Sequence, residues 1–195
     1  MGEEGAHAPV LERLGLEPPA VAALGRYLDL VAAWNPRVNL TGARTAEQRV
    51  AVLVAPVLPV AAVVEHGPLL DIGSGSGSPG LVLALLRRDL PVTLLEPRQR
   101  RWAFLREAAR VGGRFDLTVL RARHDAYKGP AACSVTVRAL SLPLADIAPL
   151  LVPGGRVLIW GQVPADVDRF RPEADPAPGV HAYRLDPGAG VSRST

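Results

Sequence analysis

The chain has 195 residues, of which 48% are apolar and 21% charged, and a formal net charge of +3. This length can bury one sizeable core but is too short for two full domains, so we expect a single compact unit. Cys133 is the only cysteine, which excludes an intramolecular disulfide framework. Residues 1–20 lack the layout of a secretory signal, and the apolar stretches are short or broken by proline. We therefore expect a soluble, cytoplasmic protein with no membrane partner.

The basic residues are arginines with the exception of Lys128. The charge permits a polyanionic partner without requiring one. No Cys/His spacing typical of a zinc site occurs, and we expect no metal.

The first 65 residues predict a small helical cap. Apolar residues recur at helical spacing over Leu11–Leu16 and Pro19–Trp34. Glu47–Val64 continues in a helix-like way until Pro56 and Pro59 interrupt it.

Residues 66–195 predict an α/β domain. Short apolar runs alternate with amphipathic stretches, which is typical of a parallel sheet covered by helices. The expected strands are Leu69–Ile72, Val92–Leu95, Leu117–Leu120, Ser134–Val137, Arg156–Trp160 and His181–Leu185. The expected helices are Pro79–Arg88, Gln99–Val111 and Leu142–Leu151. We expect Asp166–Gly179 to be a loop or partly disordered, and Gly188–Thr195 barely to supply an edge strand.

A glycine-rich turn follows the first expected strand, where Asp71 is succeeded by Gly73, Gly75, Gly77 and Gly80. Glycine lets the backbone approach a ligand without a Cβ clash, and Pro79 suits the first turn of a helix. We therefore expect a ligand across this turn. Residues 75–80 also satisfy the pattern G-x-G-x-x-G, so the glycines alone leave a nicotinamide or flavin dinucleotide open.

Two carboxylates favour S-adenosyl-L-methionine over a dinucleotide. Asp71, at the end of its strand, could hold the methionine ammonium directly or through water, whereas it would repel a pyrophosphate. Glu96 lies at the end of the next strand, 19 residues beyond Gly77, where it could accept hydrogen bonds from the ribose hydroxyls of either cofactor. The sequence therefore predicts a methyl donor bound at the carboxyl edge of the sheet.

From Leu24 to Gln162 the sequence resembles the bacterial 16S rRNA guanine-N7 methyltransferase G family, the glucose-inhibited division B family. The resemblance is carried by Trp34-Asn35, Asn39-Leu40-Thr41, the turn from Asp71 to Gly80, Leu94-Leu95-Glu96, Arg100-Arg101, Phe104-Leu105, Arg123, Arg138-Ala139 and Pro153-Gly154-Gly155-Arg156. The Trp-Asn-x-x-x-Asn-Leu-Thr segment is more specific than the glycines. The resemblance implies a class I S-adenosylmethionine-dependent methyltransferase sheet, Rossmann-like, with an N-terminal helical cap.

The resemblance also implies cofactor contacts at matching positions. It places Glu96 at the ribose, His124 and Asp125 near the adenine, and Arg138 beside the cofactor. His124 could stack on adenine or lie at the surface. Together with the turn, the expected cofactor-binding residues are Asp71, Gly73, Gly75, Gly77, Ser78, Glu96, His124, Asp125 and Arg138.

The expected substrate is guanine N7 in 16S rRNA, presented as naked RNA or as the 30S subunit, with the enzyme a monomer. N7 carries no proton at neutral pH, so alignment takes the place of acid–base catalysis. Arg98, Arg100 and Arg101 begin an expected helix, where cations oppose its macrodipole, which favours RNA contact over pairing with Glu96 or Glu107. We expect Trp34, Trp102, Phe104 and Leu105 to be packing residues, with an RNA platform as the alternative for Trp34. The expected substrate-binding residues are Asn39, Arg100, Arg101 and Arg123, although an Asx turn would explain Asn39 almost as well.

The chain departs from the family on the substrate side. Leu53, Pro56 and Val57 stand where the family carries His-x-x-Asp-Ser, Ser78 replaces an apolar residue, and Trp160 replaces a lysine. Three alternatives therefore stay open: a methyltransferase of a non-RNA substrate, a degenerate cofactor-binding protein and a nicotinamide-dependent oxidoreductase.

Overall fold

The structure, a computed structural model, describes residues 5–162 and 167–188 and centres on a seven-stranded sheet. Its strands are β1 (Leu69–Ile72), β2 (Val92–Leu95), β3 (Thr118–Leu120), β4 (Ala132–Arg138), β5 (Leu151–Trp160), β6 (Phe170–Pro172) and β7 (Val180–Leu185). They are ordered β3-β2-β1-β4-β5-β7-β6. The first five strands are parallel, whereas β7 runs antiparallel to both β5 and β6. This arrangement agrees with the expected fold class.

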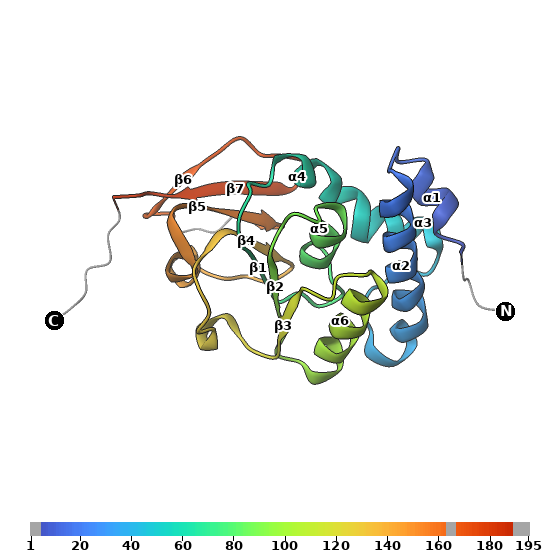
Figure 1. Ribbon diagram of the computed structural model, residues 1–195. Helices are drawn as coiled ribbons and strands as arrows, with labels where there is room; N and C mark the ends of the chain where they lie inside the picture. Colours follow the sequence, from blue (N-terminus) through green and yellow to red (C-terminus); the bar gives the residue numbers. More distant parts are fainter. Residues whose placement is uncertain (1–4, 163–166, 189–195) are drawn as a thin grey trace.

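Helices cover the sheet mainly on one face. They are α1 (Ala8–Glu12), α2 (Pro18–Val38), α3 (Ala46–Arg49), α4 (Leu58–Val63), α5 (Gly80–Leu86), α6 (Gln99–Val111) and α7 (Leu144–Ile147). Four tighter or wider turns accompany them: η1 (Val50–Val54, a π-helix) and the 3₁₀ turns η2 (Ala55–Val57), η3 (His124–Ala126) and η4 (Ala148–Leu150). Figure 1 shows α5 and α6 between the sheet and the long helix α2.

The cap shares its hydrophobic core with the sheet. Leu24 and Leu28 of α2 are fully buried in one cluster with Leu83 of α5 and Phe104 of α6. A second, smaller cluster covers the opposite face, where Ile147 of α7 and neighbouring side chains lie against β1, β4 and β5. Because the larger core crosses the boundary near residue 65, cap and sheet pack as one body.

Most expected elements agree with the observed ones, and three do not. The helical stretch expected over Leu11–Leu16 lies earlier, at Ala8–Glu12, and is followed by a turn. The helix predicted over Leu142–Leu151 is reduced to α7 and η4, because Pro143 and Pro149 remove backbone donors from it. The loop predicted over Asp166–Gly179 is wrong at Phe170–Pro172, which forms the edge strand β6. A proline is tolerated there because an edge strand leaves half of its backbone groups unpaired. Of the segment expected to provide that edge, Gly188 is in a turn and residues 189–195 lie outside the described residues.

The helical stretch Ala46–Val63 is long and apolar enough to meet the minimum for a membrane span, with a mean hydropathy of 1.5 over 18 residues. It consists of α3, η1, η2 and α4 in succession, because Pro56 interrupts regular α-helix. Its inward side chains, among them Leu53, Val54 and Val57, belong to the larger core. The stretch therefore packs with its inward side against the hydrophobic core of the domain.

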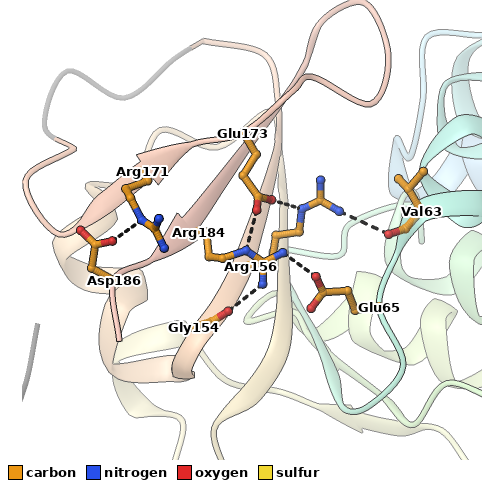
Figure 2. Close-up of polar contacts among 8 residues, drawn as sticks. All are labelled: Val63, Glu65, Gly154, Arg156, Arg171, Glu173, Arg184 and Asp186. Atoms are coloured by element: carbon orange, nitrogen blue, oxygen red, sulfur yellow. Dashed lines mark hydrogen bonds and ion pairs between the residues drawn. The ribbon is translucent and has the colours of Figure 1, made fainter. Parts of the chain in front are cut away.

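A network of ion pairs joins the last strands to the cap, at the ends of β5 and β7 (Figure 2). Arg184 of β7 donates to Glu173 (Nε to Oε1, 2.5 Å), to Glu65 after α4 (Nη2 to Oε1, 2.5 Å) and to the carbonyl of Gly154 (2.9 Å). The Nε of Arg156 lies 2.7 Å from Oε2 of the same glutamate, Glu173. Two arginines thus share one carboxylate and connect segments that are far apart in the sequence.

Candidate active site

A cleft of about 470 Å³ opens at the carboxyl ends of β1, β2 and β4. The strand order reverses between β1 and β4, which is the position at which open α/β sheets bind ligands. The walls of the cleft are formed by the cap, the glycine turn, the start of α6 and the loops after β3 and β4. The lining residues are Leu40, Thr41, Val52, Leu53, Ile72, Gly73, Ser74, Gly75, Ser76, Ser78, Glu96, Pro97, Arg98, Arg101, Ala122, Arg123, His124, Arg138, Ala139, Leu140 and Leu142.

The glycine turn is held from both sides. Gly73, Gly75 and Gly77 have φ values of +71°, +51° and +97°, a region that other residues enter only with strain. The first two line the cleft. Gly77 faces the cap instead, since a Cβ there would lie 3.3 Å from the Tyr27 ring. The Tyr27 hydroxyl in turn donates to the carbonyl of Ser76 at 2.9 Å, so α2 supports the turn from behind.

Glu96 is buried at the floor of the cleft, with both carboxylate oxygens engaged by backbone. Oε2 accepts the N–H of Gly75 at 3.0 Å and Oε1 accepts the N–H of Arg98 at 2.8 Å. Each carboxylate oxygen can accept a further hydrogen bond. The geometry fixes this carboxylate in the cleft and leaves it able to receive ligand hydroxyls, as the ribose prediction requires.

Asp71 does not line the cleft. Its side chain is fully buried, and Oδ1 accepts the Thr136 hydroxyl at 2.6 Å across the register pair between β1 and β4. A Cβ on Gly80 would come within 2.5 Å of this side chain, so Asp71 lies directly against the start of α5. Burial raises the pKa of Asp71 to about 6, although the bond from Thr136 opposes this. The position does not support the predicted direct contact with an ammonium group.

Arg138 joins the turn to the cap. Its Nη1 donates to Ser78 Oγ at 2.7 Å and its Nη2 donates to the Val52 carbonyl at 2.8 Å. The Ser78 hydroxyl donates onward to the carbonyl of Leu53 at 2.7 Å. The two residues predicted to touch the cofactor therefore also fix one wall of the cleft. Burial holds the pKa of the Arg138 guanidinium below its ordinary value.

The departures from the family pattern lie at this junction. Pro56 has no N–H, so the Val52 carbonyl lacks the donor that a regular α-helix would give it. Arg138 supplies that donor, and the indole Nε1 of Trp160 donates to the Pro56 carbonyl at 3.2 Å. Leu53 is buried and lines the cleft. Side chains of the sheet thus bond to backbone carbonyls of the interrupted helix.

The predicted substrate arginines are divided between two surfaces. Arg101 lines the cleft and donates from Nη2 to the Asn39 carbonyl at 3.0 Å, a partner not foreseen from the sequence. Arg123 also lines the cleft, with Nε 3.3 Å from an oxygen of Asp125. Arg100 does not line the cleft, because it points to another side of α6 and lines a groove against α2.

His124 lines the cleft, and its side chain is only 11% exposed. The side chain is therefore mostly covered by protein, and its contact with adenine stays a prediction. Asp125 does not line the cleft, and its side chain is 59% exposed.

The loop after α2 is organised by Asn35 rather than Asn39. The Asn35 Oδ1 accepts the N–H groups of Leu40 and Thr41 at 2.7 and 2.9 Å, and its Nδ2 donates to the Thr41 carbonyl. Asn39 is exposed at φ +52° and ends the helix. The side chain that orders the Trp-Asn-x-x-x-Asn-Leu-Thr segment is therefore Asn35, and a substrate contact of Asn39 stays a prediction.

Packing residues behave as predicted around α6. Trp34 meets Phe104 edge-to-face at a centroid distance of 5.8 Å, and Phe104 and Leu105 are fully buried. Trp102 is half-buried and donates from Nε1 to the Val119 carbonyl.

The family model of GidB, rRNA small subunit methyltransferase G, matches residues 20–164. The chain belongs to the GidB family. Ribosomal RNA small subunit methyltransferase G of Halorhodospira halophila is 37% identical over 150 residues, which cover 75% of this chain and 71% of that protein. The protein of the same name from Gluconobacter oxydans is 34% identical over 175 residues, covering 86% and 89%. The predicted resemblance is confirmed.

Solved structures agree on the fold. An RNA methyltransferase from Salinibacter ruber, in complex with S-adenosyl-L-homocysteine, superposes with a TM-score of 0.54 and 20% identity, covering 71% of this chain and 92% of that one. This chain therefore has a class I methyltransferase fold.

Proposed function

We propose that this protein methylates guanine N7 in 16S rRNA, with S-adenosyl-L-methionine as methyl donor. The observation that carries the proposal is the Glu96 carboxylate, fixed by Gly75 and Arg98 at the floor of a cleft lined by left-handed glycines. Membership of the GidB family supports the RNA substrate. We further propose that the protein acts as a cytoplasmic monomer on RNA within the 30S subunit.

The residues of the cleft fit this cofactor. Gly73 and Gly75 leave space for a ligand that a side chain would occupy only with backbone strain. Glu96 would accept the ribose hydroxyls, and the half-buried His124 would lie at the adenine. The antiparallel β7 between β5 and β6 departs from the 3-2-1-4-5-6 order of dinucleotide-binding sheets, which favours a methyl donor over NAD or FAD.

The cofactor, when bound, supplies an electrophilic methyl group. The task of the chain is to hold guanine in line with it, and such alignment can contribute about 7–11 kcal/mol. Val52, Leu53 and Leu140 give the cleft an apolar wall. Arg98 and Arg123, exposed at its mouth, give the RNA phosphates cationic partners.

One observation weighs against a degenerate, non-catalytic protein. Although the family's polar residues are replaced at Leu53, Pro56 and Trp160, the wall they form is tightly bonded through Arg138 and Ser78. Three of these contacts each satisfy a backbone carbonyl beside the cleft, so this wall is ordered and can still bound a substrate.

The test offers purified protein labelled S-adenosyl-L-methionine together with 30S subunits or naked 16S rRNA from a strain that lacks the modification. We expect label in one of the two RNAs, located at a guanine N7 by the strand cleavage that this modification permits. Binding of S-adenosyl-L-homocysteine without label in either RNA would contradict the RNA assignment. Binding of NAD in its place would contradict the methyltransferase assignment.

A further inference from the structure

A groove separate from the cleft lies between the end of α2 and the start of α6. Its lining residues, here called the Trp34 groove, are Ala33, Trp34, Arg37, Val38, Gln99, Arg100 and Ala103. The groove has a volume of about 650 Å³. Within the described part of the chain its lining includes no carboxylate.

The groove combines an anchored aromatic ring with unpaired cations. The Trp34 indole packs edge-to-face on Phe104 and is half-buried, so its orientation is fixed while part of it lines the groove. Arg37 and Arg100 are exposed, and across residues 5–162 and 167–188 neither guanidinium has a hydrogen bond or ion pair. Arginine usually finds a carboxylate or carbonyl when one is near, so this pair is left for an external anion.

The charge at the start of α6 points in the same direction. Its first turn contains no acidic residue, although the helix dipole favours acids there. Arg98 and Arg101 face the cleft while Arg100 faces the groove. Arg101 donates at 3.0 Å to the carbonyl of Asn39, which lies in the chain between Val38 of the groove and Leu40 of the cleft. Cleft and groove are therefore neighbours along one cationic edge.

We propose that the Trp34 groove binds a single-stranded RNA nucleotide next to the target guanine, with its base on Trp34 and its phosphate on Arg37 and Arg100. Aromatic stacking accepts any base, and arginines hold the backbone without reading sequence. This inference rests on the proposed function, because the RNA strand is the one that the cleft would methylate. Guanine recognition stays in the cleft, and the groove adds affinity and register.

The test compares variants for binding of unmodified 16S rRNA and 30S subunits over a range of salt concentrations. Arg37→Gln with Arg100→Gln should weaken RNA binding and lower the slope of log affinity against log salt by about 1 to 2. Trp34→Leu should weaken binding by about 5- to 150-fold, and Trp34→Phe should restore most of it because a stacking ring remains. Methylation should show a raised KM for RNA with kcat nearly retained.

Arg110→Gln is the matched control, because Arg110 lies at the end of the same helix and pairs with Glu107. It should leave the salt slope close to that of the wild type. The double variant Arg37→Gln with Arg100→Gln should bind S-adenosyl-L-homocysteine with wild-type affinity in calorimetry.

The groove proposal would be overturned if the double variant Arg37→Gln with Arg100→Gln methylated RNA and kept wild-type RNA affinity and salt slope. The proposed function would then stay intact. A wild-type protein that neither binds nor methylates RNA would overturn both. Equal effects of Arg110→Gln and the double variant would also overturn the groove, since they would report net charge alone.

Discussion

Asp71 shows how one side chain can serve a site without entering it. Its position near the end of β1 predicts a ligand contact, but its side chain contacts Thr136 and lies against Gly80. Sequence places a residue on a strand, whereas the direction of its side chain depends on the neighbouring strand and helix. Here the register pair with Thr136 decides that direction.

The buried carboxylate predicts a pH-dependent stability. Since burial raises the pKa of Asp71 to about 6 in the folded protein from 3.8 for an unperturbed aspartate, the folded state binds this proton more tightly. Its contribution to the free energy of unfolding is therefore greatest below about pH 4 and is lost as the pH rises through about 6. Asp71→Asn removes the titration, so the stability of wild type minus variant should fall by up to about 3 kcal/mol between about pH 4 and 7.

Urea unfolding of both proteins across this range measures the difference directly, and other titrating groups cancel because both proteins share them. A difference that stays constant with pH would show that folding does not shift the pKa of Asp71.

Glu96 predicts a loss of cofactor affinity. Glu96→Gln removes a charged acceptor that binds the Gly75 N–H and would bind the ribose, so affinity for S-adenosyl-L-homocysteine should fall by about 10-fold or more. Calorimetry measures the loss. Glu107→Gln is the control, because Glu107 pairs with Arg110 on the outside of α6. Equal affinities of the wild type and Glu96→Gln would remove Glu96 from the binding site.

At the scale of elements, the interrupted helix behind the cleft depends on donors from the sheet. Arg138→Met leaves the Val52 carbonyl without its partner and should lower the free energy of unfolding by about 1–3 kcal/mol. In a Pro56→Ala background the restored N–H can bond to Val52, so the same change should cost less. Urea unfolding of the four proteins gives the coupling, which we expect to exceed about 0.5 kcal/mol.

Arg123→Met serves as the control for this cycle, since Arg123 is exposed and pairs with Asp125. Its effect should add to that of Pro56→Ala. Strict additivity for Arg138 would mean that the proline does not create the need for the arginine.

Sequence predicted the elements whose signal is local. β1, β2 and α6 have the expected bounds, because each carries its own apolar pattern and boundary residues. The strand β6 was missed and the helix at α7 was predicted too long. Segments of three or four residues carry too little sequence pattern, and their structure depends on what they pack against. The same limit applies to the site. Because ligands bind at the carboxyl ends of parallel strands, the sequence predicted that the glycines and Glu96 lie together. It did not show that Arg100 and Arg101 face different sides of one helix.

For the whole molecule, the ion pairs around Arg184 predict which surface arginine matters. Arg184→Met removes contacts to Glu65, Glu173 and Gly154 at once, whereas Arg171 has a single partner within the described residues, Asp186. Arg171→Met should cost at most about 1 kcal/mol in urea unfolding, as exposed pairs do. Arg184→Met should cost clearly more, and its effect should shrink as salt is added. Equal costs for the two variants would show that the network acts as separate surface pairs.

Glu65 and Arg184, which form an ion pair in the folded protein, leave the ribosome at very different times. Glu65 is made 119 residues before Arg184, and β7 lies between β5 and β6 although it is the last strand described. While the chain emerges from the ribosome, β5 is therefore an open edge of the sheet, and Glu65 faces water until β7 arrives. Non-local pairing of this kind forms late and slowly. A chain that stops before Val180 would lack β7 and leave the β5 edge exposed to other strands. We expect such a chain to aggregate through this edge even though the residues of its cleft are all present.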